Sequence, residues 1–119
     1  MSGVTPYLIR AYCYWIEDSG LTPHILVNCE KNGVTVPDGF AKEGKVVLNI
    51  SSPATTARLL TNKFISFKAR FNGALEQIIV PCDAVLTIYA QESGEGIVFE
   101  KKSGSKSLNA KKNSLTLLD

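Results

Sequence analysis

The sequence has very few of the side chains that metal sites and disulfide frameworks require. It contains one histidine, His24, and three cysteines, Cys13, Cys29 and Cys82, spaced too widely for a Cys-x-x-Cys pair. A structural zinc site needs four ligands, usually in close pairs, so this set does not predict one. Because the number of cysteines is odd, we expect three reduced, buried thiols in a cytosolic protein and a structural role for His24.

The chain also lacks long apolar runs and the common catalytic motifs. No stretch approaches the roughly 18 apolar residues of a membrane-spanning helix, and the start, Met1–Pro6, does not have the basic and apolar regions of a secretory signal. Phosphate-binding glycine loops and the usual hydrolase and zinc-protease motifs are absent. We therefore expect a cytoplasmic binding protein with no enzymatic activity, no cofactor and no metal.

Charge is unevenly distributed along the 119 residues. Residues 1–100 contain 8 Lys or Arg and 10 Asp or Glu, a balance of −2, whereas residues 101–119 contain 5 Lys and only Asp119, a balance of +4. The length favours one domain, placed at residues 1–100, with a tail at 101–119. Nucleic-acid-binding domains usually concentrate basic charge on the folded body, which this body does not. The basic tail is either a solvated tether or a segment that touches RNA or an acidic lipid surface.

The first predicted element is a helix with more aromatic side chains than one buried face requires. Thr5 can cap it, Pro6 suits its first turn, and Gly20 offers a left-handed stop. Aromatic residues are enriched at protein interfaces, so the surplus is either core of the same chain or a face for self-association. The aromatic side chains are Tyr7, Tyr12, Tyr14 and Trp15.

After Gly20 the apolar pattern changes from helical spacing to alternation, which predicts about six short strands. Asn-Gly pairs at 32–33 and 72–73 are hairpin turn signals, and residues 54–62 read as a connector. The pattern favours a mainly β fold with one N-terminal α-helix: a small, bent antiparallel β-barrel with the helix at one end. The expected strands are 25–29, 34–36, 46–50, 64–71, 77–80 and 97–99. Residues 86–90 continue as helix or form a further strand, and their β-branched residues favour the strand.

The C-terminal segment has a different character from the body. Lys, Ser, Asn and Gly dominate residues 101–113, a composition typical of a disordered tail. Three leucines, Leu115, Leu117 and Leu118, then follow at the extreme end. They form a short linear motif for a partner, dock back on the body, or have no role.

Several landmarks along the chain, taken in order, resemble the stringent starvation protein B (SspB) family. The resemblance covers about residues 6–100 and is more specific than any single short motif. The landmarks are Pro6–Tyr12 running on to Trp15, Leu21–His24, Gly33–Pro37, Val46–Ile50, Phe67–Gly73, Val80–Pro81, Ala84–Leu86 and Ile88–Gly94.

This resemblance implies an Sm-like β-barrel with an N-terminal helix through which two subunits dimerise. It further implies a bacterial adaptor that captures proteins carrying the tag encoded by transfer-messenger RNA (the ssrA tag). Such an adaptor hands tagged proteins to the ClpXP unfoldase–protease through a flexible tail that binds ClpX. The family needs no catalytic residue and no cofactor.

The resemblance also suggests which residues of this chain act. The segment 67–71 matches the part of the family that lines the peptide groove, and Ala69 leaves room for an extended peptide. Phe67 and Phe71 are either groove walls or core. The tag-binding set is Asn49, Phe67, Ala69, Arg70 and Phe71, the dimer set is Tyr7, Ala11, Tyr12 and Trp15, and the ClpX-binding set is Leu115, Leu117 and Leu118.

One departure affects the tail, and two other functions stay open. Better-known family members have a long acidic tail with an apolar end beside Arg or Lys. Here the tail is short and basic, the basic flank is displaced to Lys111 and Lys112, and the chain ends in Asp119. The alternatives to the adaptor are an Sm-like RNA-binding protein and a plain interaction scaffold, although phosphate binding needs the clustered basic charge that the body lacks.

Overall fold

The computed structural model describes residues 3–99, which begin with helix α1 (Thr5–Asp18). The predicted stop is confirmed, because Gly20 has a φ of 79° and its N–H returns to the Glu17 carbonyl at 3.0 Å. The predicted cap is wrong: Val4 precedes the helix, Thr5 is already helical, and no side chain caps the first turn. The buried stripe of α1 has helical spacing and consists of Pro6, Ile9, Cys13 and Ile16.

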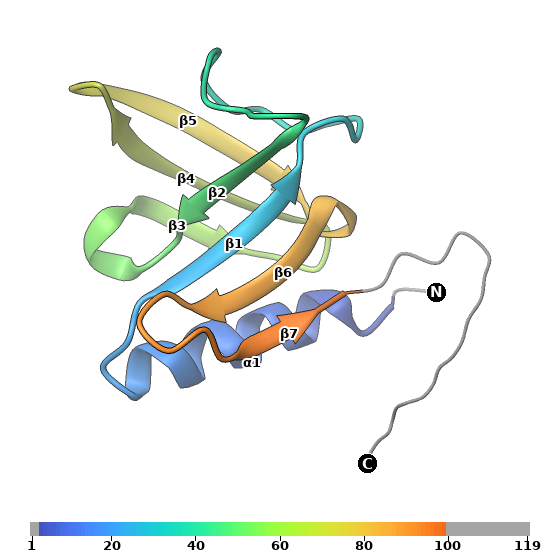
Figure 1. The fold of residues 1–119 in the computed structure, drawn as a ribbon, viewed down its shortest axis with the longest axis vertical. Coiled ribbons are helices and arrows are strands. Elements are labelled where there is room, and N and C mark those ends of the chain that lie inside the picture. The colour runs from blue at the N-terminus through green and yellow to red at the C-terminus, as the bar shows by residue number, and fades with distance from the viewer. Residues whose placement is uncertain (1–2, 100–119) are drawn as a thin grey trace.

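Seven strands follow and form two antiparallel sheets (Figure 1). The larger sheet has the order β2-β1-β6-β7, so β2 and β7 are its edges. The smaller sheet has the order β3-β4-β5. The strands of the larger sheet are β1 (Pro23–Asn28), β2 (Lys45–Asn49), β6 (Val85–Ala90) and β7 (Gly96–Val98). Those of the smaller sheet are β3 (Thr56–Leu60), β4 (Phe64–Phe71) and β5 (Ala74–Pro81).

Two short 3-10 turns connect the sheets, and one hairpin is as predicted. The turns are η1 (Ser52–Ala54), between β2 and β3, and η2 (Cys82–Ala84), between β5 and β6. Asn72 and Gly73 have φ values of 53° and 84° and join β4 to β5, so the hairpin signal at 72–73 is confirmed.

Three expectations about the sheets are wrong. Residues 34–36 form no strand, and only Thr35 bridges to Ile79. Residues 54–62, expected as a connector, contain η1 and strand β3. Within residues 3–99 the two sheets do not close into a barrel, because neither β2 nor β7 pairs with a strand of the smaller sheet. The fold is therefore mainly β with one N-terminal helix, as expected, but built from two open sheets.

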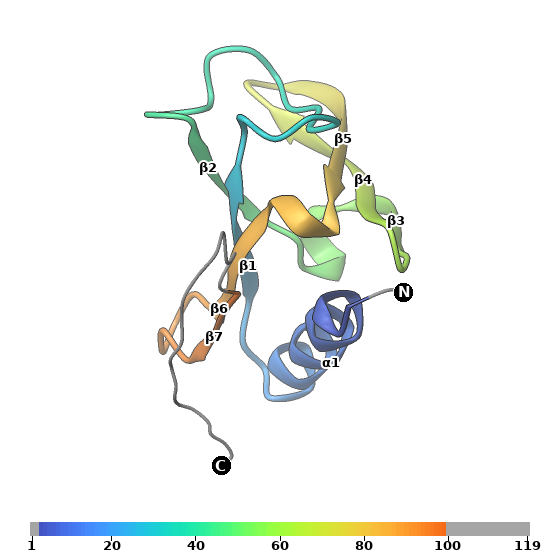
Figure 2. The same cartoon turned by 90° about the vertical axis from the view of Figure 1, so that its right-hand side faces the viewer.

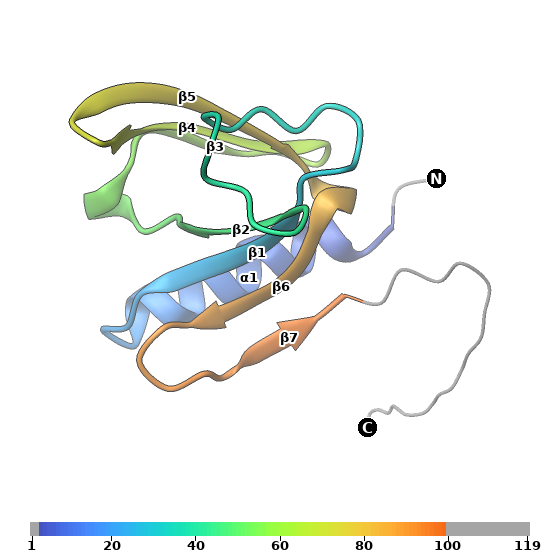
Figure 3. The same cartoon turned by 45° about the horizontal axis from the view of Figure 1, so that its top comes forward.

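The core lies between the two sheets and helix α1. Figure 2 shows the β2-β1-β6-β7 sheet on one side, the β3-β4-β5 sheet on the other, and α1 closing the space below them. Alternate side chains of β1, Ile25 and Val27, are fully buried here and meet Phe67 of β4 and Ile9 of α1 in one cluster. Seen from above, α1 runs behind β1 and β6 (Figure 3). No helix within residues 3–99 is long and apolar enough to cross a membrane.

Candidate peptide groove and self-association face

An open hollow of about 390 Å³ lies where β2 begins and β4 ends. Its floor is mostly apolar, and Phe40 meets Phe71 edge to face, with ring centroids 4.9 Å apart. Two lysines, Lys42 and Lys45, stand among its lining residues. A hollow with apolar walls and a few charged groups suits a side chain of a bound peptide. The lining residues are Leu26, Phe40, Lys42, Lys45, Val46, Val47 and Phe71.

One face of β4 runs from the core into this hollow. Successive side chains of a strand alternate between faces, so Phe67, Ala69 and Phe71 share one face. Phe67 is only 1% exposed, whereas Ala69 and Phe71 are partly buried at the open end. The structure therefore places Phe67 in the core, and it places Ala69 between Phe67 and a residue that lines the hollow.

The other two residues of the expected tag-binding set lie apart from this face. Arg70 is exposed on the opposite face of β4 and donates a hydrogen bond to the Gly73 carbonyl at 3.2 Å. Asn49, at the end of β2, accepts a hydrogen bond from the Ser51 N–H at 2.9 Å. Their part in tag binding stays a prediction.

Helix α1 presents three aromatic side chains to solvent on one face. Tyr7 is 52% exposed, Tyr14 and Trp15 are each 48% exposed, and Ala11 is exposed between them. These positions fall within about a third of the helix circumference at 3.6 residues per turn. Tyr12 lies beside this face; it packs on the core and meets Trp15 edge to face at 5.7 Å. The aromatic surplus of the sequence is thus largely exposed, and Tyr14 joins the residues expected at an interface.

The exposed Tyr7 is held in place by the smaller sheet. Asn62, in the turn after β3, donates to the Tyr7 hydroxyl at 3.2 Å. Arg10 lies over the Tyr7 ring at 4.7 Å and donates to Asn62 Oδ1 at 2.8 Å and to the Leu60 carbonyl at 3.3 Å. The aromatic face therefore has a fixed shape, which reduces the ordering cost of binding a partner.

The far end of α1 is tied to the connection between the two sheets. Arg58 of β3 contacts the Glu17 carboxylate at 3.0 Å and donates to the Ile50 carbonyl at 2.7 Å. The Ser52 N–H donates to the same carboxylate at 2.7 Å. Burial by itself raises the pKa of Glu17, but the hydrogen bonds from Arg58 and Ser52 outweigh it, so the pKa lies below its ordinary value. No pattern in the sequence indicates this contact.

We expect Glu17→Gln to destabilise the fold by about 1–2 kcal/mol at pH 7, because it removes a charge that the Arg58 guanidinium and the Ser52 N–H contact. A lowered folded-state pKa stabilises the protein above the unfolded value and loses that effect as the pH falls through the folded one. The difference from the parent protein should therefore shrink as the pH falls below about 4.5, the ordinary pKa of a glutamate side chain. Urea unfolding at several pH values measures it. Asp18→Asn, at the exposed neighbouring carboxylate, is the control and should cost little; an equal loss there would contradict the role of the Glu17 contacts.

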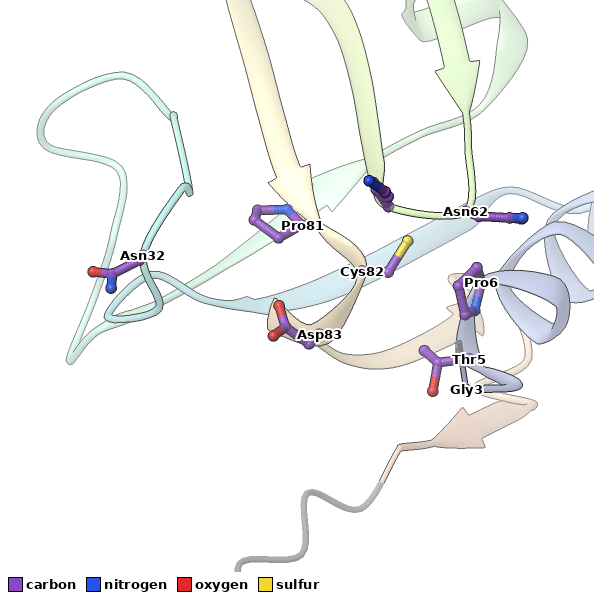
Figure 4. Close-up of a pocket in the computed structure, with 9 residues that line it drawn as sticks. Gly3, Thr5, Pro6, Asn32, Asn62, Pro81, Cys82 and Asp83 are labelled. Carbon is purple, nitrogen blue, oxygen red and sulfur yellow. The ribbon is translucent and has the colours of Figure 1, made fainter. Parts of the chain in front are cut away.

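A second hollow, of about 630 Å³, lies elsewhere and carries no evident chemistry. Figure 4 shows it between the start of α1, the turn after β3 and η2, with Cys82 pointing into it. Burial raises the pKa of the Cys82 thiol, which disfavours the reactive thiolate. The other lining residues are Gly3, Thr5, Pro6, Asn32, Asn62, Lys63, Pro81 and Asp83.

The remaining thiols and the histidine also fit structural roles. Burial raises the pKa of Cys13 to about 11, with Arg58 opposing that rise. Cys13 and Cys82 are buried as expected, but Cys29 is only partly buried. Burial lowers the pKa of His24, which packs edge to face on Tyr89. Residues 3–99 bring no three His, Cys, Asp or Glu side chains together as a metal site.

The expected ClpX-binding leucines, Leu115, Leu117 and Leu118, lie outside the described residues. Sequence reasoning did not point to the groove positions Phe40, Lys42 or Val47. Phe40 and Lys42 belong to the long connection between β1 and β2, whose course depends on distant contacts such as the ring of Phe71.

Comparison with known proteins gives two consistent findings. The family model described as "SspB: Stringent starvation protein B" matches residues 3–116. A protein of Haemophilus influenzae named "Stringent starvation protein B homolog" is 44% identical over 104 residues, which cover 87% of this chain and 69% of that protein. A match of this extent includes both sheets and the exposed helix.

Proposed function

The chain belongs to the stringent starvation protein B family, and we propose that it is a proteolytic adaptor of the bacterial cytoplasm. In this proposal it binds the ssrA tag, encoded by transfer-messenger RNA, and delivers tagged proteins to ClpXP without altering any covalent bond. The observation that carries the proposal is the open hollow between β2 and β4, lined by Phe71, with the small residue Ala69 on the same face of β4 as Phe71. We also propose that the two sheets represent an opened form of the Sm-like barrel implied by the family, with the groove at the opening.

In this proposal the two parts of the chain have different roles. Residues 1–100 capture the tag, and residues 101–119 tether the complex to ClpX through Leu115, Leu117 and Leu118. A short tether holds its cargo at an effective concentration on the order of millimolar. Weak contacts at each end therefore suffice for delivery.

The test of the proposed function compares two labelled ligands. We expect the fluorescence anisotropy of an ssrA peptide to rise on titration with the protein, and to change little between 50 mM and 300 mM salt. RNA binding through phosphates would instead fall steeply with salt. Saturable, salt-sensitive RNA binding with no response from the peptide would replace the adaptor by an Sm-like RNA-binding protein, and no response from either would leave an interaction scaffold.

We propose that the exposed face of α1 is the homodimer interface. The expected residues Tyr7, Ala11 and Trp15 lie on it, with Tyr12 at its border. Aromatic side chains anchor interfaces because they bury large areas with few rotatable bonds. A dimer would place two grooves and two tails on one particle.

Trp15→Glu is expected to convert the dimer to a monomer, because it places a charge where an aromatic ring would be buried. We expect at least a tenfold weaker dimerisation constant, measured by light scattering across a dilution series. Leu75→Glu is the matched control, since Leu75 is 51% exposed on β5 and not on α1. A Trp15→Glu protein that stays dimeric would show that the interface lies elsewhere.

A further inference from the structure

The outer face of the smaller sheet carries apolar side chains at positions where an antiparallel sheet usually carries polar ones. In a sheet that is packed on one side, residues alternate between the core and water, so the outward positions are normally polar. The inward residues of β4 and β5, including Phe67 and Ile78, are buried in the core. At the outward positions, however, Leu59 is 55% exposed, Leu75 is 51% exposed and Phe64 is 36% exposed.

The strand register gathers most of these apolar side chains into one patch. Ser66 of β4 pairs with Leu59 of β3 on one side and with Ile79 of β5 on the other. Phe64 lies two positions before Ser66 and therefore projects from the same face. The small side chain of Ser66 is only 9% exposed between these larger neighbours. A contiguous exposed apolar patch marks an interaction site, whereas single exposed apolar residues do not.

The charged residues of this outer face are all basic. Lys68 and Arg70 follow Ser66 at alternate positions of β4, and both are exposed. The one carboxylate in β3, β4 and β5 belongs to Glu76, which pairs with Ala69 and so lies on the opposite face. Among residues 3–99, neither Lys68 nor Arg70 forms an ion pair. Because residues 1–100 contain more Asp and Glu than Lys and Arg, this face is a basic area on an acidic body.

The dimensions of the outer face match those of one α-helix. Neighbouring strands lie about 4.8 Å apart, so three strands span about 10 Å, which is the diameter of a helix with its side chains. From Phe64 to Arg70 the face runs for about 20 Å, the length of a helix of about 13 residues. Among residues 3–99, no helix or strand lies over this face (Figure 2). An apolar sheet face is ordinarily covered by another layer.

We propose that the outer face of β3, β4 and β5 binds one acidic amphipathic helix of a partner protein. The apolar side chains of this helix pack on Leu59, Phe64 and Ile79, and its carboxylates pair with Lys68 and Arg70. A helix that lays its apolar face on a partner is a common mode of recognition. The surface is separate from the hollow between β2 and β4 and from the exposed face of α1, so this contact is additional to the proposed tag binding and dimerisation.

Three other occupants fit this surface less well. Residues 101–119 contain 5 Lys and only Asp119, so Lys68 and Arg70 repel this segment. A second copy of the chain, packed face to face, would bring four basic side chains together with no carboxylate from either face. RNA-binding sheets stack bases on several aromatic side chains, whereas here Phe64 is the one aromatic residue beside aliphatic ones.

Fluorescence anisotropy with three labelled probes tests the proposal. The acidic probe is a helical peptide of about 16 residues, with leucine at every third or fourth position, glutamate beside the leucines and alanine elsewhere. The basic probe has lysine in place of each glutamate, and the third probe is a short oligouridine. We expect saturable binding of the acidic probe, at least tenfold tighter than that of the other two at 50 mM salt. Equal binding of both peptides, tighter binding of the RNA, or no binding of any probe would overturn the proposal.

Two variants with matched controls test the residues involved. Lys68→Glu is expected to weaken binding of the acidic probe at least tenfold, because it places like charges together, and Leu59→Ser is expected to weaken it about three- to tenfold. Lys31→Glu, in the connection after β1, and Val98→Ser, 65% exposed on β7, make the same changes elsewhere and should bind the probe as the parent does. Equal losses in variants and controls would contradict the assigned surface.

NMR of the unaltered protein locates the acidic probe without any substitution. We expect the amide signals that shift on titration to belong to β3, β4 and β5, and an excess of ssrA peptide to leave the probe bound. Shifts confined to α1, or to the hollow of Phe40 and Phe71 with displacement by the ssrA peptide, would overturn the proposal. This measurement also decides the matter if Lys68→Glu or Leu59→Ser fails to fold.

Discussion

Ala69→Gln is expected to weaken ssrA peptide binding by about 100-fold while leaving the protein folded. Ala69 lies on the same face of β4 as the buried Phe67 and as Phe71, which lines the hollow proposed as the peptide groove. A glutamine side chain at this point fills the space that an extended peptide would occupy. Steric conflict of this kind costs about 1–3 kcal/mol or more, and 2.8 kcal/mol corresponds to about 100-fold in Kd. Fluorescence anisotropy with a labelled peptide measures the loss.

Lys68→Gln is the matched control for this substitution. It introduces the same side chain one residue earlier, on the exposed opposite face of β4. We expect the Lys68 variant to bind the peptide with unchanged affinity, and both variants to show the circular dichroism and urea midpoint of the parent within experimental error. Equal peptide affinity of the two variants would show that Ala69 is not at the peptide site and that the peptide binds to another surface.

Local patterns in the sequence predict the helix and the long hairpin well. Pro6 marks the start of α1 and Gly20 marks its end, because each residue acts through its own backbone conformation. The strand at Phe64–Phe71 alternates clearly in its second half, and the Asn72–Gly73 pair supplies the left-handed conformations of a tight hairpin turn. Each of these signals depends on residues close together in the chain.

Features that depend on distant contacts could not be predicted in the same way. Strand β3 has a weak pattern, because it lies at an edge and its register with β4 shifts between Thr56 and Leu59. Its Arg58 meets Glu17 across 41 positions of the sequence. Likewise, nothing local distinguishes an open pair of sheets from a closed barrel; the difference is whether the edge of β2 finds a partner.

Burial decreases along β4 from Phe67 to Phe71. This explains why the sequence alone leaves Phe67 and Phe71 open as either core residues or groove walls. Phe67 and Phe71 have the same residue type and the same face, and they are separated by four positions. Phe67 is 1% exposed because α1 and both sheets enclose it, whereas Phe71 lies where the sheets diverge and contacts Phe40 of the long connection. One strand thus contributes to the core at one end and to the hollow at the other, so the hollow is held by the same packing that stabilises the fold.

Deletion of residues 114–119 is expected to abolish accelerated degradation of tagged proteins and to leave peptide binding unchanged. The reason is that, in the proposed function, capture and delivery depend on different parts of the chain. Without the terminal leucines the adaptor still binds its cargo but no longer raises the effective concentration of that cargo at ClpX. Degradation of a tagged fluorescent protein by ClpXP, at a substrate concentration well below saturation, measures the first effect, and anisotropy measures the second.

Two tail variants separate the apolar end from the basic flank. Replacing Leu115, Leu117 and Leu118 by serine should reproduce the deletion, because apolar side chains provide the burial that anchors a short motif. Replacing Lys111 and Lys112 by serine should retain most of the delivery, because exposed charges contribute little to affinity at physiological salt. If the lysine variant loses delivery and the leucine variant keeps it, the tail engages its partner electrostatically, and delivery will then fall as salt rises.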